Sequence, residues 1–160
     1  MSTSSTSLTI EAPDGLPFIE IQREFDYPVE AVFAAHKDPE QVCQWLGPRG
    51  YTMDLPTYDF VTGGSYRFIH HDGQGGAFAF HGVFHVVRDN EFVIQTFEFE
   101  GVPDVVSIES MTFERLPDNR TRLVGRSVYP SIEARDSMIS SGMERGVREG
   151  YEQLEELLKN

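Results

Sequence analysis

The sequence predicts an α+β fold in which a long C-terminal helix packs across a strongly bent antiparallel sheet. Three patterns lead to this prediction. Residues 18–25 alternate between the two sides of a strand, residues 51–129 form a series of strand-like segments joined by tight turns, and residues 131–160 carry apolar side chains at a helical period. Because no helical segment interrupts the central series, its strands are expected to run antiparallel as a meander.

The N-terminal part is predicted to form one strand followed by two short helices. On one side of the strand at residues 18–25 we expect Ile19, Ile21, Arg23 and Phe25, alternating with Glu20, Gln22 and Glu24. Pro28 stands at the start of the first helix, where its fixed backbone angle is favourable. Asp38 and Pro39 open the second helix, which is predicted to run through Trp45.

The central segments are predicted to be strands because they are rich in aromatic and β-branched residues and are separated by turn-forming residues. The expected strands cover residues 66–70, 77–88, 91–100, 105–116 and 121–129. The expected turns cover residues 63–64, 72–76, 89–90, 101–104 and 117–119. The turn at Asp89-Asn90 is short enough to be a two-residue hairpin loop.

The C-terminal segment is predicted to be one amphipathic helix, which starts after a cap at Pro130-Ser131 and continues to Asn160. Its apolar side carries Ile139, Met143, Val147, Tyr151, Leu154 and Leu158. Glycines recur every four residues along this helix, at Gly142, Gly146 and Gly150. Each interior glycine costs about 1 kcal/mol relative to alanine, so we expect the sheet, or a ligand held between sheet and helix, to approach closely.

Length and composition are those of a single acidic domain. We expect a disordered tail at residues 1–8 and one domain at residues 9–160. Thirteen basic and 26 acidic residues give a net charge of −13, which opposes binding to nucleic-acid phosphates and to anionic membranes. The single Cys43 cannot form an internal disulfide and the polar N-terminus does not match a signal peptide, so we expect a cytoplasmic protein.

Several short motifs match a known family in their order and spacing. They are Arg23-x-Phe25-x-x-Pro28-x-x-x-Val32-Phe33, Asp38-Pro39, Trp45-x-Gly47-Pro48, Gly63-Gly64-x-Tyr66, Gly82-x-Phe84, Thr112-Phe113-Glu114 and Gly142-Met143-x-x-Gly146, continuing to Leu154 and Leu157. On these residues the chain resembles the activator-of-heat-shock-chaperone-ATPase-like proteins of the START-like, polyketide-cyclase (SRPBCC) superfamily. The resemblance covers nearly the whole chain and implies the helix-grip fold, a curved sheet wrapped around a C-terminal helix.

The resemblance implies three kinds of function, because this superfamily includes ligand carriers, cyclases and chaperone co-factors. The first is binding of a small, mainly apolar or aromatic molecule between sheet and helix, without a cofactor. The second is a cyclase, dehydratase or hydrolase that uses His70 or Glu109 as acid or base. The third is a chaperone-associated interaction module. The eukaryotic activators use an additional N-terminal domain for much of their chaperone contact, and we expect no such domain here.

Strand alternation predicts which side chains meet on the concave side of the sheet. With a two-residue loop at Asp89-Asn90, Phe84 lies opposite Gln95. The same register, continued through the next two turns, places Glu109 between Gln95 and Ser127. The other residues expected on this side of the two facing strands are Phe78, Phe80, Val86, Val93, Phe97 and Phe99. A polar row of three residues is therefore predicted to cross an aromatic interior.

Glu109 has two interpretations. A carboxylate buried without a partner costs several kcal/mol, so Glu109 must be protonated, paired or wetted by a cavity. Pairing with Arg23, on the inward side of the first strand, would make Glu109 structural. A wet cavity would make it a polar anchor for a ligand. The sequence leaves both interpretations open.

The histidines are candidate bases and metal ligands. His70 is predicted to point inward, where it can be a general base, a pocket donor or a hydrogen-bonded core residue. His71, His81 and His85 are explained by a solvated strand face, because no carboxylate or thiol completes a zinc-ligand spacing. We therefore expect neither a metal nor a cofactor.

Inward-facing aromatic residues are more often core than ligand contacts, but together they must line any cavity. The predicted ligand-binding residues are Trp45, Tyr66, Phe68, His70, Phe80, Phe84, Gln95, Phe97, Glu109, Met111, Ser127, Met143, Gly146, Val147 and Gly150. No nucleophile motif accompanies them, so no catalytic residue is assigned.

Overall fold

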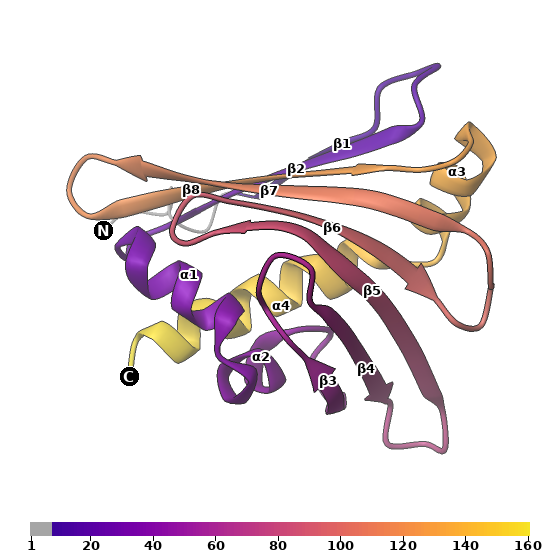
Figure 1. Cartoon of the computed structure of the whole chain (residues 1–160), viewed down its shortest axis with the longest axis horizontal. Coiled ribbons are helices and arrows are strands. Elements are labelled where there is room, and N and C mark those ends of the chain that lie inside the picture. The colour runs from indigo at the N-terminus through magenta and orange to yellow at the C-terminus, as the bar shows by residue number, and fades with distance from the viewer. Residues whose placement is uncertain (1–7) are drawn as a thin grey trace.

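The computed structural model describes residues 8–160 and has the predicted α+β arrangement (Figure 1). Eight antiparallel strands form one sheet in the order β1-β2-β8-β7-β6-β5-β4-β3. The strands are β1 (Leu8–Glu11), β2 (Phe18–Phe25), β3 (Thr52–Tyr58), β4 (Ser65–His71), β5 (Ala77–Arg88), β6 (Phe92–Phe99), β7 (Val106–Leu116) and β8 (Arg120–Val128). The helices are α1 (Val29–Lys37), α2 (Pro39–Trp45), α3 (Ile132–Ser140) and α4 (Met143–Leu158).

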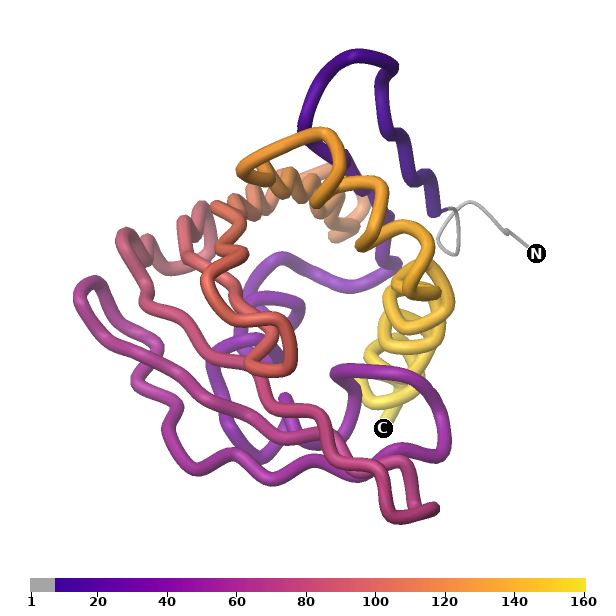
Figure 2. Tube along the Cα trace, turned by 90° about the vertical axis from the view of Figure 1, so that its right-hand side faces the viewer, coloured from indigo at the N-terminus to yellow at the C-terminus, as the bar shows by residue number. Residues whose placement is uncertain are grey.

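The sheet curves around the interior, and α4 crosses on the side away from β5 and β6 (Figure 2). Leu154 of α4 is fully buried. The ring of Tyr151, also on α4, packs edge-on against Phe25 of β2 at a centroid distance of 5.7 Å and stacks on Trp45 of α2 at 5.9 Å. These contacts fix α4 against both the sheet and α2, which confirms the expected helix-grip arrangement.

Strand β1 is an element that the sequence analysis did not predict. It begins at Leu8, the last residue of the expected N-terminal tail, and it pairs with β2 through contacts such as Ile10 opposite Ile21. A strand of four residues is too short to give a clear alternation, and its hydrogen bonds depend on the long neighbour. Residues 1–7 of the predicted tail lie outside the described residues.

The two short helices start as predicted. Pro28 immediately precedes α1, and the side chain of Asp38 caps α2 by accepting a hydrogen bond from the backbone N–H of Glu40 at 3.0 Å. The indole N–H of Trp45, at the end of α2, donates to the carbonyl of Ala35 in α1 at 2.9 Å. The two helices are therefore joined by a buried hydrogen bond.

The prediction of one unbroken C-terminal helix is wrong. The side chain of Ser131 caps α3 as expected, by accepting from the N–H of Ala134 at 3.0 Å. The helix then stops, because Gly142 has a φ of +86°, in the left-handed region that glycine adopts without steric cost.

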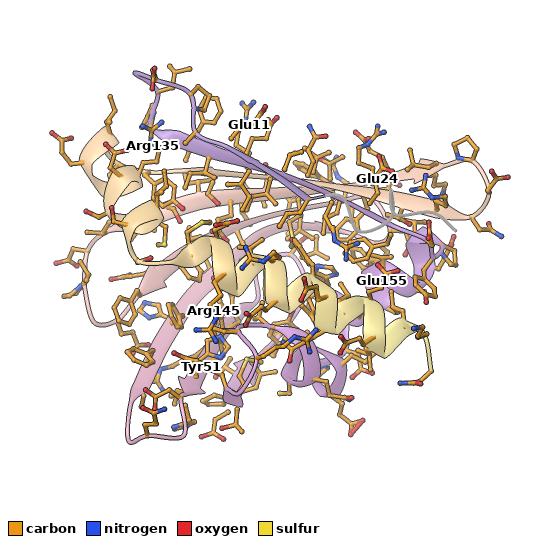
Figure 3. The ribbon with its side chains drawn as sticks, turned by 180° about the vertical axis from the view of Figure 1, so that it is seen from behind. Glu11, Glu24, Tyr51, Arg135, Arg145 and Glu155 are labelled. Carbon is orange, nitrogen blue, oxygen red and sulfur yellow. The ribbon has the colours of Figure 1, made fainter. Side chains whose placement is uncertain are left out.

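Arg135 attaches α3 to the β1–β2 loop. Its guanidinium donates to the carbonyls of Pro13 and Leu16 in that loop, at 2.6 and 2.7 Å (Figure 3).

The two glycines within α4 have different surroundings. A Cβ atom at Gly150 would lie 3.3 Å from both the backbone N of Gly47 and the carbonyl O of Trp45, so the α2–β3 loop approaches the helix closely. Gln153 holds that loop by donating to both carbonyls, of Trp45 and Gly47, at 3.1 and 2.9 Å. A Cβ atom at Gly146 would make only ordinary contact with Pro48 at 3.8 Å. The close approach expected from the sheet thus comes from this loop.

The predicted register of β5 and β6 is correct, although the predicted loop is not. Arg88 pairs with Phe92, so the loop has three residues rather than two. An irregularity between Phe84 and Val86 compensates, and Phe84 lies opposite Gln95 as predicted. The same irregularity turns Val87, rather than the predicted Val86, toward the core.

We predict opposite effects for alanine at the two glycines within α4. Gly146→Ala gains helix propensity and meets only ordinary contacts, so the free energy of unfolding should rise by about 1 kcal/mol. Gly150→Ala gains the same propensity but presses a methyl group against loop backbone, so the free energy of unfolding should fall by about 1 kcal/mol. Urea unfolding of both variants measures this. Equal stabilisation by both would show that the loop leaves room at Gly150.

Candidate ligand-binding site

The predicted polar row is present on the concave side of the sheet. Glu109 of β7 lies opposite Gln95 of β6 on one flank and Ser127 of β8 on the other. The hydroxyl of Ser127 donates to Oε2 of Glu109 at 3.1 Å, and Nε2 of Gln95 donates to Oε1 at 3.4 Å. The same Nε2 donates to the hydroxyl of Tyr66 at 3.3 Å. Four strands therefore contribute to one hydrogen-bonded cluster.

The concave face of the sheet is buried at one end, whereas the side chains in its middle are partly exposed. At the end beside α1 and α2 it is fully buried, through Phe25, Phe84, Val93, Phe113 and Leu123. One step along the same strands, the inward residues keep accessible surface and are Ile21, Gly125, Met111, Gln95, Glu109 and Phe80. Glu109 thus lies in the interior but keeps part of its surface accessible.

Burial sets the acidity of Glu109. It raises the pKa of this carboxyl group from 4.5 to about 7, while the hydrogen bonds from Ser127 and Gln95 act in the opposite direction. Arg23, the partner considered from the sequence, is 2% exposed and forms its ion pair with Glu155 of α4 at 3.0 Å. Glu155 is labelled on α4 in Figure 3. Burial, rather than pairing with Arg23, therefore dominates the electrostatics of Glu109.

An aromatic wall lies beside the polar row on β4, β5 and β6. Phe68 stacks on Tyr66 at a centroid distance of 6.0 Å and on Phe80 at 5.0 Å. Phe80 in turn stacks on Phe97 at 5.3 Å. Together these rings form a continuous apolar surface beside the polar row.

His70 stands at the far end of this wall. It is 7% exposed, and its ring contacts Tyr51, Phe68 and Phe80. Burial, together with the neighbouring His71, lowers the pKa of His70 to about 4, so the ring is neutral at physiological pH. Within the described residues its Nδ1 atom is buried without a hydrogen-bond partner. His70 is thus core-like in burial, but lacks the hydrogen bond that such a core histidine normally makes.

The remaining predicted site residues fall into two groups. Trp45, Phe84 and Gly150 belong to the packed frame: Trp45 stacks on Tyr151, Phe84 packs edge-on against Phe60 at 4.8 Å, and Gly150 faces the α2–β3 loop. The half-buried residues of the N-terminal half of α4 are Met143, Gly146 and Val147.

Tyr151 is an interior residue that the predicted site left out. Burial, and then the charge of Glu109, raise the pKa of Tyr151 to about 12, so this hydroxyl stays protonated near the polar row. Its position four residues after Val147 on the apolar side of the helix was the signal that could have identified it.

Two of the histidines on the outer side of the sheet, His71 and His81, lie beside carboxylates. His81 contacts Glu98 at 3.3 Å and Glu100 at 2.9 Å, and His71 contacts Asp54 at 2.9 Å. Between residues 8 and 160, no group of three or more histidine, cysteine, aspartate or glutamate side chains is arranged to hold a metal ion.

An open surface groove lies between α2 and β3, away from the polar row. Its lining residues are Pro39, Glu40, Cys43, Gln44, Met53, Asp54 and Leu55. It contains none of the predicted site residues, and its lining carries two carboxylates beside apolar side chains, so it is a separate feature from the concave face.

The curved sheet, the α4 grip and the polar row in an aromatic interior define a START-like helix-grip protein. The chain belongs to the family described as Activator of Hsp90 ATPase homolog 1-like protein, whose model matches residues 26–159. Comparison with curated proteins finds no match. Within the described residues, no helix has both the length and the apolar character needed to cross a membrane.

Solved structures share this fold. Protein Ms6760 from Mycobacterium smegmatis is 23% identical with a TM-score of 0.85, covering 95% of this chain and 97% of its own. A protein from Arthrobacter aurescens, solved by NMR in solution, is 26% identical with a TM-score of 0.85, covering 94% and 91%. DynU16, described as a putative protein in the dynemicin biosynthetic locus, is 21% identical with a TM-score of 0.66, covering 92% of this chain and 48% of its own.

The raised pKa of Glu109 predicts a specific pH dependence of stability. Below pH 4.5 the carboxyl is protonated in the folded and unfolded states, so its stabilising contribution is fully present. That contribution is lost as the pH rises to about 7, because the unfolded state ionises first. The loss amounts to at most about 3 kcal/mol, and to less where water reaches the carboxyl.

Urea unfolding between pH 4.5 and 8 measures this effect. Glu109→Gln should flatten the profile relative to the unmodified protein, whereas Glu91→Gln, at an exposed position in the β5–β6 loop, should leave it unchanged. Parallel profiles for Glu109→Gln and the unmodified protein would mean that Glu109 titrates like a solvated carboxyl group.

Proposed function

We propose that this protein binds a small, mainly apolar or aromatic molecule between the concave face of the sheet and α4. The observation that carries the proposal is the partly exposed middle of the inward face, where Glu109 and its hydrogen-bonding neighbours lie among stacked aromatic rings. Ligand sites are mainly apolar with a few convergent polar groups that fix orientation. The other end of the same face is buried, so the exposed part is confined to the region of the polar row.

The packed frame around this region supports binding without large rearrangement. The Arg23–Glu155 ion pair and the contact of Gly150 with the α2–β3 loop hold α4 in place beside the sheet. Preorganisation of this kind reduces the entropy that binding costs.

The single Cys43 is a free thiol, which is consistent with a reducing cytoplasm as the compartment.

An enzymatic role in the same place is the second candidate. A carboxyl group with a pKa of about 7 can both give and take a proton near neutral pH, which is the property of a general acid or base. A cyclase, dehydratase or hydrolase reaction would then use Glu109 against the bound molecule. Turnover that is lost in Glu109→Gln while binding persists would favour this candidate over a carrier.

A chaperone-associated role rests on the family description alone. Among the described residues no surface identifies a chaperone as a partner, and the net charge of −13 does not identify one either. Stoichiometric stimulation of Hsp90 ATP turnover by this chain would place that role first.

We predict that at least one class of apolar compound stabilises the protein. A thermal-shift screen with flavonoids, fatty acids and polycyclic aromatic compounds tests this, because a ligand at 100 times its Kd stabilises the folded state by about 2.7 kcal/mol. Phe97→Ala opens the aromatic wall and should weaken binding, whereas Val83→Ala, on the exposed outer side, should not. Two results together would contradict the proposal: a crystal structure in which side chains fill the interior, and a screen in which no compound raises the melting temperature.

A further inference from the structure

The hydroxyl of Tyr66 has a fixed hydrogen-bond direction. It donates to the backbone carbonyl of Thr96 at 2.7 Å, and a carbonyl can only accept. Burial raises the pKa of Tyr66 well above its usual range, so the hydroxyl keeps its single proton and that proton stays in this bond. The oxygen of Tyr66 is therefore left as an acceptor for its other polar neighbour.

Gly82 of β5 leaves room for this bond. A Cβ atom at Gly82 would lie 2.7 Å from the Tyr66 hydroxyl and would clash with the carbonyl oxygen of Thr96. Beside it, the backbone N–H of Val83 donates to the side-chain hydroxyl of Thr96 at 2.9 Å. The Tyr66 hydroxyl is thus held by β5 and β6, and not only by β4, which carries it.

Tyr66 in turn decides the direction of the Gln95 side chain. The two ends of an amide have the same shape, so its hydrogen-bond partners determine which end is the nitrogen. Nε2 of Gln95 donates to the Tyr66 hydroxyl at 3.3 Å and to Oε1 of Glu109 at 3.4 Å. A reversed amide would place its carbonyl oxygen against the oxygen of Tyr66, whose proton is already used.

The carbonyl oxygen of Gln95 is then the unused acceptor of the polar row. It has no hydrogen-bond partner among residues 8–160, and it is not one of the unpaired atoms that are fully buried, so it keeps accessible surface. Both oxygens of Glu109, in contrast, already have partners, in Gln95 and Ser127. A ligand that reaches this part of the concave face therefore meets a free acceptor at Gln95.

We propose that Tyr66 is a positioning residue of the candidate site, which keeps the carbonyl oxygen of Gln95 free, so that the site selects a ligand with a hydroxyl or N–H donor. Tyr66 is itself 4% exposed and acts through Gln95, without touching the ligand. This inference rests on the proposed function and names the chemical group by which the ligand is recognised.

The protonation of Glu109 determines when Tyr66 is needed. An ionised carboxylate accepts from Nε2 of Gln95 and holds the amide in this direction without help. A protonated carboxyl group can instead donate to the carbonyl oxygen of a reversed amide, and the Tyr66 hydroxyl is then the group that prevents the reversal. Without that hydroxyl, the reversed amide would stabilise the protonated form and raise the pKa of Glu109.

The groups that face Glu109 from the neighbouring elements stay neutral near pH 7. They are hydroxyls whose pKa is raised by burial: Tyr66 on β4, Tyr129 after β8 and Tyr151 on α4. Arg23 on β2 acts on Tyr151 and forms an ion pair with Glu155. Between pH 5.5 and 8.5 the three hydroxyls therefore keep their protons, while Glu109 itself changes charge.

NMR titration of the Glu109 carboxyl carbon in the ligand-free protein tests the role of Tyr66. The variant is Tyr66→Phe, and the control is Tyr58→Phe, which removes a hydroxyl that also donates to a backbone carbonyl, that of His36. Gln95 provides one of the hydrogen bonds that lower the pKa of Glu109, so the midpoint reports the direction of the amide. Tyr66→Phe should raise the midpoint by about half a pH unit or more, and Tyr58→Phe should leave it unchanged.

Two probes of nearly the same shape test the selection of a donor. Indole carries an N–H group, whereas 1-benzothiophene has sulfur in its place and cannot donate. Chemical-shift titrations at pH 5.5 and 8.5 measure the Kd of each probe for the unmodified protein and for the variants Tyr66→Phe, Gln95→Leu and Tyr58→Phe.

In the unmodified protein and in Tyr58→Phe, indole should bind at least about threefold more tightly than 1-benzothiophene at both pH values. Tyr66→Phe should keep this preference at pH 8.5, where Glu109 is ionised, and lose it at pH 5.5, where the amide is free to reverse. Gln95→Leu should remove the preference at both pH values, because the acceptor is gone.

Two results overturn the proposal and leave the proposed function standing. An unchanged Glu109 midpoint in Tyr66→Phe would show that Tyr66 does not fix the amide. Equal binding of the two probes by the unmodified protein would leave an apolar site that does not select a donor. Binding of neither probe overturns the assigned ligand group, and if no compound of the thermal-shift screen raises the melting temperature either, the proposed function is overturned with it.

Discussion

The burial of one carboxyl group inside an aromatic sheet is the constraint that organises the interior of this protein. Glu109 is enclosed between β6 and β8 and receives hydrogen bonds from the neutral side chains of Gln95 and Ser127. An apolar residue at this position would avoid the desolvation cost. Perturbed ionisable groups of this kind concentrate at functional sites, which is why the middle of the concave face, and not the acidic surface groove, is the candidate site.

The rest of the fold holds this region in shape. α1, α2 and the ends of the strands form a dry core, in which Phe33 packs edge-on against Phe113 at 5.1 Å. α4 is fixed to that core by Tyr151 and by the loop that touches Gly150. The chain leaves α3 for α4 through the left-handed Gly142, which lets α4 take its own direction across the sheet. A rigid frame at one end thus leaves the middle of the sheet partly open.

Most of the fold could be predicted from alternation and turn residues, because β2 and β4 to β8 are long enough to show a period of two. The polar row was predicted correctly even though the β5–β6 loop has one residue more than expected, since the irregularity near Val86 restored the register. β1 was missed because four residues show no clear pattern. The helix break was missed because Gly142 looks the same in sequence as Gly146, and only its backbone angle distinguishes them.

The partners of the buried charges could not be predicted. Arg23 and Glu155 are 132 residues apart, and alternation says which side a residue faces but not which long side chain reaches it from a helix. Tyr151 was also left out of the site, although its position on the apolar side of the helix, four residues after Val147, was a signal that could have identified it. The unpaired Nδ1 of His70 depends on atomic packing beneath Tyr51 and Gly47, which no local pattern reports.

The most direct test of this account is an NMR titration of the Glu109 carboxyl carbon in the folded, ligand-free protein. Selective ¹³C labelling of glutamate, with Glu109→Gln to assign the signal, gives the midpoint of this one group. We expect a midpoint near pH 7, set by burial among aromatic rings. A midpoint near 4.5 would contradict it, because Glu109 would then be solvated or paired and the concave face would lack the desolvated carboxyl on which the site depends.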